Sequence, residues 1–246
     1  MDLQLKGKLA LVTGSTAGIG RAIASQLGRE GARVIVNGRK AESAKKTADE
    51  LAKETGGTFI AFGGDLSQAA DAERVVRANP GIEILVNNLG IFEPKAFEDI
   101  PDEDWRRFFE VNVLSGARLS RLVLGGMKQR NWGRIIFISS ESALQIPAEM
   151  IHYGMTKTAQ IAISRGLAEA VAGTGITVNS VLPGPTNSRG VGDFVAALAK
   201  EQGTTFEAFE KEFFKSVRPT SLIQRFSTPL PPASRSAGSA TWAARS

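Results

Sequence analysis

Short apolar runs alternate along this chain with longer stretches in which apolar residues recur every three to four positions. The short runs are rich in Val, Ile and Leu, as in buried parallel strands, and the longer stretches are typical of amphipathic helices. The pattern predicts six strands, at residues 8–13, 33–37, 58–63, 82–87, 134–139 and 176–181. It predicts helices up to residue 29 and at residues 41–54, 68–78, 102–130 and 152–172. This alternation predicts an α/β fold, a single doubly wound domain whose parallel sheet carries helices on both faces and a crevice at the carboxyl ends of its strands.

The pattern changes after the sixth strand, where Pro183-Gly184-Pro185 interrupts it. Two amphipathic segments follow, at residues 191–200 and 206–214, and we expect residues 183–216 to form a lid over the crevice. From residue 227 onward the chain has no hydrophobic period and no acidic residue. The sequence therefore predicts one catalytic domain, residues 1–226, and a disordered or loosely attached tail, residues 227–246.

Composition narrows the class of protein. The 246 residues are 42% hydrophobic and 22% charged, which is ordinary for a globular protein. No apolar run approaches the roughly 20 residues that cross a bilayer, and the N-terminus lacks a signal-peptide pattern. With no cysteine there is no disulfide framework. We expect a cytoplasmic protein without a membrane partner.

The net charge of +5 does not indicate a nucleic-acid partner, because Lys and Arg are scattered among acidic residues. A mildly basic surface suits an anionic small molecule equally well. The chain has a single histidine and no paired-cysteine or HExxH spacing, so we expect no metal site.

A glycine-rich turn lies between the first strand and the first helix. Gly14, Gly18 and Gly20 let the backbone approach a pyrophosphate and present amide groups at a helix N-terminus. The spacing is GxxxGxG rather than GxGxxG, and it lacks the GK[S/T] ending of a nucleotide triphosphatase loop. Its position favours a dinucleotide site over an ordinary turn.

The end of the second strand indicates which dinucleotide. An acidic residue there binds the ribose hydroxyls of NAD, but the strand ends in Asn37-Gly38-Arg39. Arg39 is suited to a 2′-phosphate, so NADP is favoured and NAD stays possible; an ordinary surface arginine is the alternative. After the third strand, the Asp65-Leu66 pair is expected either against the adenine or, for Asp65, as a helix N-cap.

Candidate chemistry follows the fifth strand. That strand ends at Ser139 and Ser140, and Tyr153 and Lys157 share a face of the next helix because they are four residues apart. A cation near the phenol lowers its pKa from about 10, so we expect Tyr153 to exchange a proton near neutral pH. For the pair alone, a half-buried Tyr and a solvated Lys are the simpler interpretation.

The motifs together resemble the short-chain dehydrogenase/reductase family over roughly residues 5–226. Residues 13–20 match its TGxxxGIG loop, and Asn87-Asn88-Leu89-Gly90 resembles its NNAG motif. Ser140, Tyr153 and Lys157 match its Ser and YxxxK arrangement. Asn112 stands at the family's asparagine, and Pro183-Gly184 at the PG after strand six.

The resemblance implies a Rossmann-type domain, a nicotinamide cofactor and a role for each catalytic residue. Tyr153 would protonate the alkoxide as hydride reaches a carbonyl carbon, and Ser140 would hold the carbonyl oxygen. Lys157 would bind the nicotinamide ribose and lower the tyrosine pKa. Asn112 would interrupt its helix and hold a water that links Lys157 to solvent, or would simply be hydrogen-bonded to backbone. The cofactor is expected against Gly14, Ser15, Thr16, Gly18, Ile19, Gly20, Arg39, Asp65, Leu66, Asn88, Gly90, Tyr153, Lys157, Pro183, Gly184 and Thr186.

The chain departs from the family pattern at two places. Leu89 replaces an alanine beside the adenosine half of the cofactor. After Arg225-Phe226-Ser227-Thr228-Pro229 the pattern ends, which suggests that the reading frame diverged and that the family's last helix and strand are missing. A homodimer through the two long helices is expected, and a tetramer is not.

Three functions of different class compete. The complete set of Asn112, Ser140, Tyr153 and Lys157 favours an NADP-dependent reductase of a carbonyl or secondary alcohol. A cofactor-binding sensor or scaffold with little turnover is the alternative, and a nucleic-acid binder is remote. Phenylalanines in the lid suit an apolar or acyl-like carbonyl such as a 3-oxoacyl thioester, while sugar, steroid and xenobiotic substrates stay open.

Overall fold

The computed structural model of the chain describes residues 3–187, 204–219 and 221–239. Its centre is a sheet of six parallel strands in the order β3-β2-β1-β4-β5-β6, which confirms the predicted doubly wound α/β fold. The strands are β1 (Leu9–Val12), β2 (Arg33–Gly38), β3 (Thr58–Gly63), β4 (Ile84–Asn87), β5 (Gly133–Ile138) and β6 (Ile176–Val181). Each lies within two residues of its predicted bounds, because both faces of the sheet are covered and every strand carries apolar residues that the helices bury.

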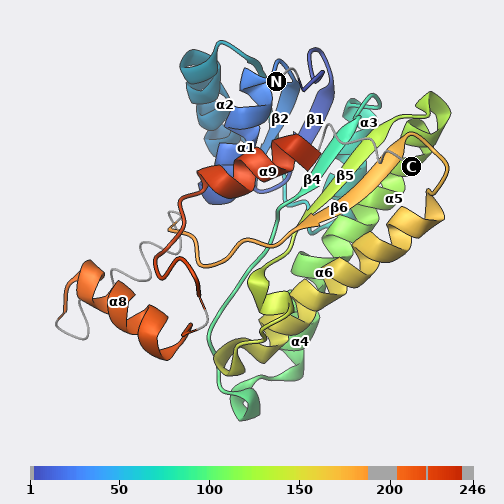
Figure 1. The fold of residues 1–246 in the computed structure, drawn as a ribbon. Helices are drawn as coiled ribbons and strands as arrows, with labels where there is room; N and C mark the ends of the chain where they lie inside the picture. The colour runs from blue at the N-terminus through green and yellow to red at the C-terminus, as the bar shows by residue number, and fades with distance from the viewer. Residues whose placement is uncertain (1–2, 188–203, 220, 240–246) are drawn as a thin grey trace.

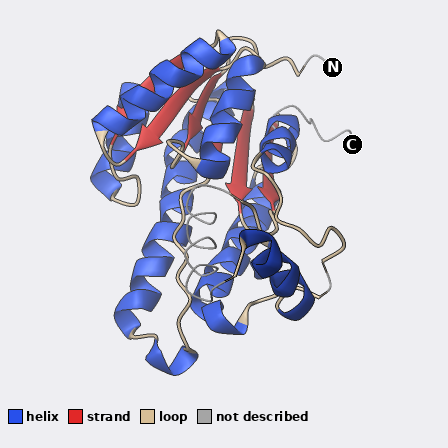
Figure 2. Cartoon of the chain, turned by 90° about the vertical axis from the view of Figure 1, so that its left-hand side faces the viewer, coloured by secondary structure: helices blue, strands red, loops and turns tan. Residues whose placement is uncertain are grey.

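Helices cover both faces of the sheet (Figures 1 and 2). One layer consists of α1 (Gly18–Arg29), α2 (Ala41–Thr55) and α9 (Leu230–Ser239), and the other of α3 (Ala69–Ala78), α5 (Ser115–Arg130) and α6 (Ile151–Ala170). Alternate residues of each strand feed the two cores: Val12 and Val34 pack towards α1, and Leu11 and Ile35 towards α3 and α5. Among the described residues, no helix has the length and apolarity needed to cross a bilayer.

The predicted long helix at residues 102–130 is continuous but changes its winding once. It begins as α4 (Asp102–Phe109), passes through a π-helical turn at Glu110–Leu114, and continues as α5. A π-turn inserts an extra residue and redirects backbone groups that an α-helix would use itself. The turn contains Asn112, as expected for a side chain that interrupts a regular helix.

Beyond the carboxyl ends of the strands lies α8 (Phe206–Ser216), where the lid was predicted (Figure 1). Its apolar face packs on Phe226 rather than on the sheet, through Phe213 and Phe214, whose ring centroids each lie 5.3 Å from that of Phe226. The lid segment therefore has a small apolar core of its own. The other helix predicted in it, at residues 191–200, lies outside the described residues.

The prediction of a loose tail from residue 227 is wrong for its first half. Residues 230–239 form α9, which packs against α1 with Ala233 and Ala237 fully buried. The sequence lacks large apolar residues here, but small side chains spaced three and four apart allow two helices to approach closely. The sequence also predicts that the last helix and strand of the family are missing. The part of this prediction that concerns a helix is wrong, because α9 follows Pro229. No seventh strand occurs among the residues described, and residues 240–246 lie outside them.

Candidate active site

A cavity of about 350 Å³ opens at the carboxyl ends of β4, β5 and β6. It collects most of the predicted site, because parallel strands deliver the residues that follow them to one edge of the sheet. Its wall includes Ile19, Asn88, Gly90, Ser140, Tyr153, Lys157, Pro183, Gly184 and Thr186. The carbonyl of Gly184 accepts a hydrogen bond from the hydroxyl of Thr186 (2.9 Å), which fixes the turn after β6.

The glycine-rich turn forms a tight cradle beside this cavity. Gly14 and Gly18 have positive φ angles of 59° and 56°, which other residues rarely adopt. A Cβ on Gly20 would lie 2.6 Å from the carbonyl oxygen of Gly14. Since α1 has no acidic residue in its first turn, its N-terminal amides face no negative side chain of their own helix. The cradle fits a dinucleotide pyrophosphate, with Ser15 and Thr16 in the same turn.

Two asparagines hold the cradle in place. The side-chain oxygen of Asn37 accepts from the amide of Gly14 (3.0 Å), while its nitrogen donates to the carbonyl of Gly64 (3.0 Å). The side chain of Asn88 donates to the carbonyls of Thr13 (2.9 Å) and Gly14 (3.2 Å). Sequence reasoning noted Asn37 only for the missing acid, and its buried position at the end of an apolar strand was the signal that it is structural.

The three residues expected near the adenosine have different environments. Arg39 is exposed directly after β2. The carboxylate of Asp65 is turned onto Ser67, whose amide (3.0 Å) and hydroxyl (2.7 Å) donate to it. Asp65 is therefore not the N-cap of α3, a position that Gln68 occupies. The side chain of Leu66 is buried in the core, which leaves its backbone to meet a ligand.

Tyr153 and Ser140 both line the cavity and are hydrogen-bonded to each other. Burial raises the pKa of the Tyr153 phenol above its ordinary value, and a hydrogen bond with Ser140 opposes that rise. The Ser140 oxygen also accepts from the amide of Ser142 (3.1 Å), which fixes the hydroxyl at the end of β5. Lys157, which was expected to lower the pKa of Tyr153, is not among the groups that shift it here, and the charge of the Glu141 carboxylate raises it further.

Lys157 is buried. Its ammonium nitrogen donates to the carbonyl of Ile138 (2.9 Å) and to the side-chain oxygen of Gln160 (3.2 Å). It lies 5.6 Å from the centre of the Tyr153 ring. Burial lowers the pKa of Lys157 to about 8. The solvated lysine of the simpler interpretation is not found.

Asn112 lies behind the cavity and anchors the loop after β4. Its side chain accepts from the amide of Ile91 (2.8 Å) and donates to the Ile91 carbonyl (2.9 Å). Its backbone carbonyl, in the π-turn, accepts from the side chain of Gln160 (2.6 Å). These contacts agree with the alternative interpretation of Asn112, in which its side chain is hydrogen-bonded to backbone. Gln160 itself was missed, although it follows Lys157 by three residues on the same helix face.

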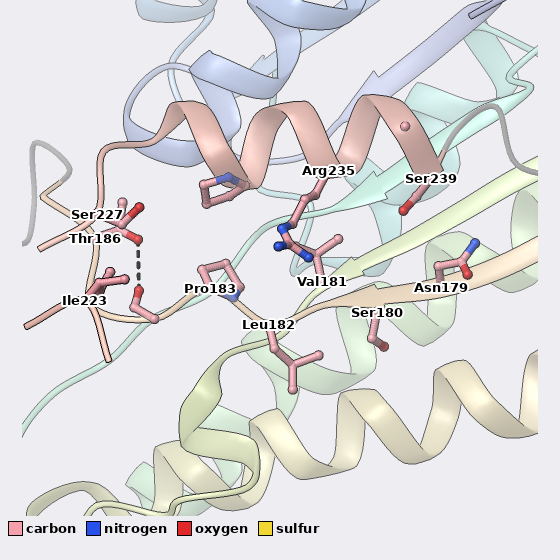
Figure 3. Close-up of a pocket in the computed structure, with 13 residues that line it drawn as sticks. Asn179, Ser180, Val181, Leu182, Pro183, Thr186, Ile223, Ser227, Arg235 and Ser239 are labelled. Atoms are coloured by element: carbon pink, nitrogen blue, oxygen red, sulfur yellow. Dashed lines mark hydrogen bonds between the residues drawn. The ribbon is translucent and has the colours of Figure 1, made fainter. Parts of the chain in front are cut away.

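A second and larger hollow, of about 730 Å³, lies between β6 and α9 (Figure 3). Arg235 of α9 points into it above Val181, and β6 forms its floor. It shares Pro183, Gly184 and Thr186 with the first cavity but does not include Tyr153 or Lys157. The smaller cavity is therefore the candidate active site.

Comparison with known proteins identifies the family to which this chain belongs. The family model for short chain dehydrogenases matches residues 8–199. The chain belongs to this family. The predicted resemblance and the assignment to an enzyme class are thereby confirmed.

Similar proteins of this family are oxidoreductases. YvaG of Bacillus subtilis (strain 168), an oxidoreductase, is 49% identical over 232 residues, which cover 93% of this chain and 87% of that protein. The D-beta-hydroxybutyrate dehydrogenase of Cupriavidus necator is 38% identical over 221 residues, covering 88% and 85%.

Two solved structures with the same fold as this chain contain NADPH. L-sorbose reductase of Gluconobacter frateurii, in complex with NADPH and L-sorbose, is similar with a TM-score of 0.91 at 28% identity over 98% of this chain and 92% of that one. An actinorhodin polyketide ketoreductase with NADPH has a TM-score of 0.86 at 31% identity, covering 96% and 93%. This chain is accordingly an oxidoreductase with a site for a nicotinamide dinucleotide.

Proposed function

We propose that the protein is an NADP-dependent oxidoreductase that interconverts a carbonyl compound and its secondary alcohol, with Tyr153 as the general acid and base. The observation that carries the proposal is the convergence of Ser140, Tyr153 and Lys157 on one cavity. That cavity is continuous with the glycine cradle through Ile19 and Asn88. Two candidate donors for one carbonyl oxygen thus face the position at which a dinucleotide would end.

The side chains divide the work of carbonyl reduction. The cofactor supplies hydride to the carbonyl carbon when bound. The Ser140 hydroxyl, fixed by the Ser142 amide, donates to the substrate oxygen, and the Tyr153 phenol transfers its proton as negative charge develops there. Because burial raises its pKa, the phenol stays protonated at neutral pH, as an acid must. Lys157 provides positive charge nearby and a hydrogen-bond donor for the cofactor ribose.

The preference for NADP rests on the carboxyl end of β2. Arg39 and Lys40 are both exposed there, and Asn37, in place of an acid, is committed to the glycine cradle. Two cations and no carboxylate at this position favour a 2′-phosphate over free ribose hydroxyls. The solved neighbours that contain NADPH are consistent with this preference.

The walls of the cavity favour a small carbonyl or alcohol substrate with an apolar body. Phe92, Phe213 and Met150 are among the apolar residues that line the cavity. The similar proteins named for hydroxybutyrate, sorbose and polyketide substrates all process carbonyl or alcohol groups. A 3-oxo acid or 3-oxoacyl compound suits both observations.

The test is a reductase assay with NADPH and a panel of apolar ketones, oxo acids and oxo esters, using wild-type protein and Tyr153→Phe. We expect turnover by the wild type, a loss of at least 10³-fold in Tyr153→Phe, and unchanged NADPH affinity in the variant. Binding of NADPH without turnover of any member by the wild type would favour the sensor or scaffold function.

A further inference from the structure

One ion pair, Arg218–Glu141, lines the active-site cavity. Four phenylalanines line the same cavity: Phe92, Phe209, Phe213 and Phe226. The Arg218 Nε donates to the Glu141 carboxylate at 3.2 Å. The two residues are 77 positions apart, and Glu141 directly follows Ser140.

The pair is partly buried between the active-site cavity and a second hollow that both residues also line. The Arg218 side chain is 14% exposed and that of Glu141 32%, and the guanidinium carbon lies 5.7 Å from the centre of the Phe213 ring. An interaction with charge is stronger at a partly buried position than on an open surface. This placement makes the pair part of the substrate environment.

Arg218 keeps donor capacity in reserve. Nε is engaged by Glu141, and Nη1 donates to the carbonyl of Val217 (2.9 Å). Within the described parts of the chain, Nη2 has no hydrogen-bond partner. Lys157, the other cation of this wall, is directed at Ile138 and Gln160. The remaining donor of Lys157 is assigned to the cofactor ribose, so Arg218 is the cation of this cavity that can donate to a substrate.

We propose that Arg218 is a specificity-determining residue that binds the carboxylate of an apolar oxo acid while Tyr153 and Ser140 hold its carbonyl. A guanidinium recognises a carboxylate through charge-assisted hydrogen bonds, and the phenylalanines accommodate the hydrocarbon body. Glu141 orients the guanidinium and lowers its affinity for anions. The preference for an acid over a neutral ligand is therefore smaller than an unpaired arginine would give. The proposal rests on the carbonyl-reductase function and names its substrate class.

The first experiment measures binding without chemistry. The protein saturated with NADP⁺ is titrated calorimetrically with 5-phenylpentanoate and with its neutral amide. We expect the acid to bind at least tenfold more tightly than the amide, and this preference to disappear in Arg218→Met. Arg218→Lys should keep part of it, because the charge remains. Arg225→Met is the matched control, since Arg225 is an exposed arginine of the same segment that does not line the cavity.

Glu141→Gln tests whether Arg218 binds the ligand or serves only as a partner in a structural ion pair. It breaks the pair but leaves Arg218, so we expect the preference for the acid to increase at least threefold. A preference that falls in Glu141→Gln, equal binding of acid and amide by the wild type, or an unchanged preference in Arg218→Met would overturn the proposal.

A second experiment distinguishes this proposal from the reductase function. The wild type and Arg218→Met are assayed with NADPH on 3-oxo-5-phenylpentanoate and on its methyl ester, and the ratio of the two kcat/KM values is compared. We expect the ratio of acid to ester to fall at least tenfold in the variant. Reduction of both compounds at a ratio independent of Arg218 overturns the anion site alone. Arg218-dependent binding of the inert acid with no reduction of either compound overturns the reductase function alone.

Discussion

The ammonium group of Lys157 lies one helical turn from Tyr153 and 5.6 Å from the centre of its ring, yet it is bonded to the carbonyl of Ile138 rather than to the phenol. Burial shifts the pKa of both residues. The charged form of each is disfavoured, so the pKa of Lys157 falls to about 8 and that of Tyr153 rises. The protein therefore pays in stability for a lysine that it keeps at the site.

This burial predicts an unusual dependence of stability on pH. The pKa of Lys157 is lowered from 10.5 to about 8 on folding, so the cost of burying its charge is fully present below pH 8 and is relieved as the pH rises towards 10.5. The free energy of unfolding without added cofactor should increase by about 3 kcal/mol over this window. The raised pKa of Tyr153 acts in the opposite direction only above pH 10. Urea unfolding at pH 7, 8, 9 and 10 measures the slope.

The matched variant for this experiment is Lys157→Met, which keeps a long side chain but cannot be charged. We expect it to be more stable than the wild type at pH 7 and to lose most of the rise between pH 8 and 10. An identical slope in the two proteins would assign the pH dependence to other groups.

Arg39→Ala should weaken NADPH binding at least tenfold, about 1.4 kcal/mol, and leave NADH binding unchanged. The reason is the loss of a charge-assisted contact to the 2′-phosphate at the exposed end of β2. Fluorescence titration with each cofactor measures the change. Arg33→Ala is the control, because Arg33 is exposed at the opposite end of the same strand. If Arg39→Ala weakened the binding of NADPH and NADH equally, Arg39 would not determine the preference for NADPH.

Gly20→Ala should abolish cofactor binding, because the added Cβ would lie 2.6 Å from the Gly14 carbonyl oxygen and 2.5 Å from the Asn88 side chain. The cradle must widen to accept it, and its amides then no longer converge. Gly125→Ala is the matched helical control, since nothing lies within 4 Å of its Cβ position. That change should stabilise the protein by about 0.5–1 kcal/mol and keep cofactor affinity. Retained NADPH affinity in Gly20→Ala would contradict the cradle.

Ala237→Leu tests the docking of α9 on α1. Ala237 is 1% exposed in this contact, so a larger side chain should reduce the free energy of unfolding by about 1–3 kcal/mol. Ser234→Leu adds the same bulk on the exposed face of α9 and should change stability little. Equal stability of the two variants in denaturant unfolding would mean that α9 is not held against α1.

Sequence reasoning predicted those features that are local in the chain. Hydrophobic periodicity located the strands, and contiguous motifs located the glycine cradle and Tyr153–Lys157, because neighbours in sequence stay neighbours on one strand end or helix face. It missed α9, whose packing depends on small side chains, and the Arg218–Glu141 pair, which joins segments 77 residues apart. Spacing placed Lys157 near Tyr153 but did not give the direction of its ammonium group. The homodimer and the cytoplasmic location stay predictions.

The position of β1 also affects the order in which the molecule is able to fold. This first strand lies in the interior of the sheet, paired on one side with β2 and on the other with β4, where Leu11 is in register with Leu85. During synthesis, β1 and β2 leave the ribosome with an open apolar edge, and that edge is closed only when β4, which begins at Ile84, follows β2, which ends at Gly38. Slow translation of the segment between β2 and β4 therefore prolongs the aggregation-prone stage of this chain, whereas a pause after β4 has left the ribosome allows the central strands to pair first.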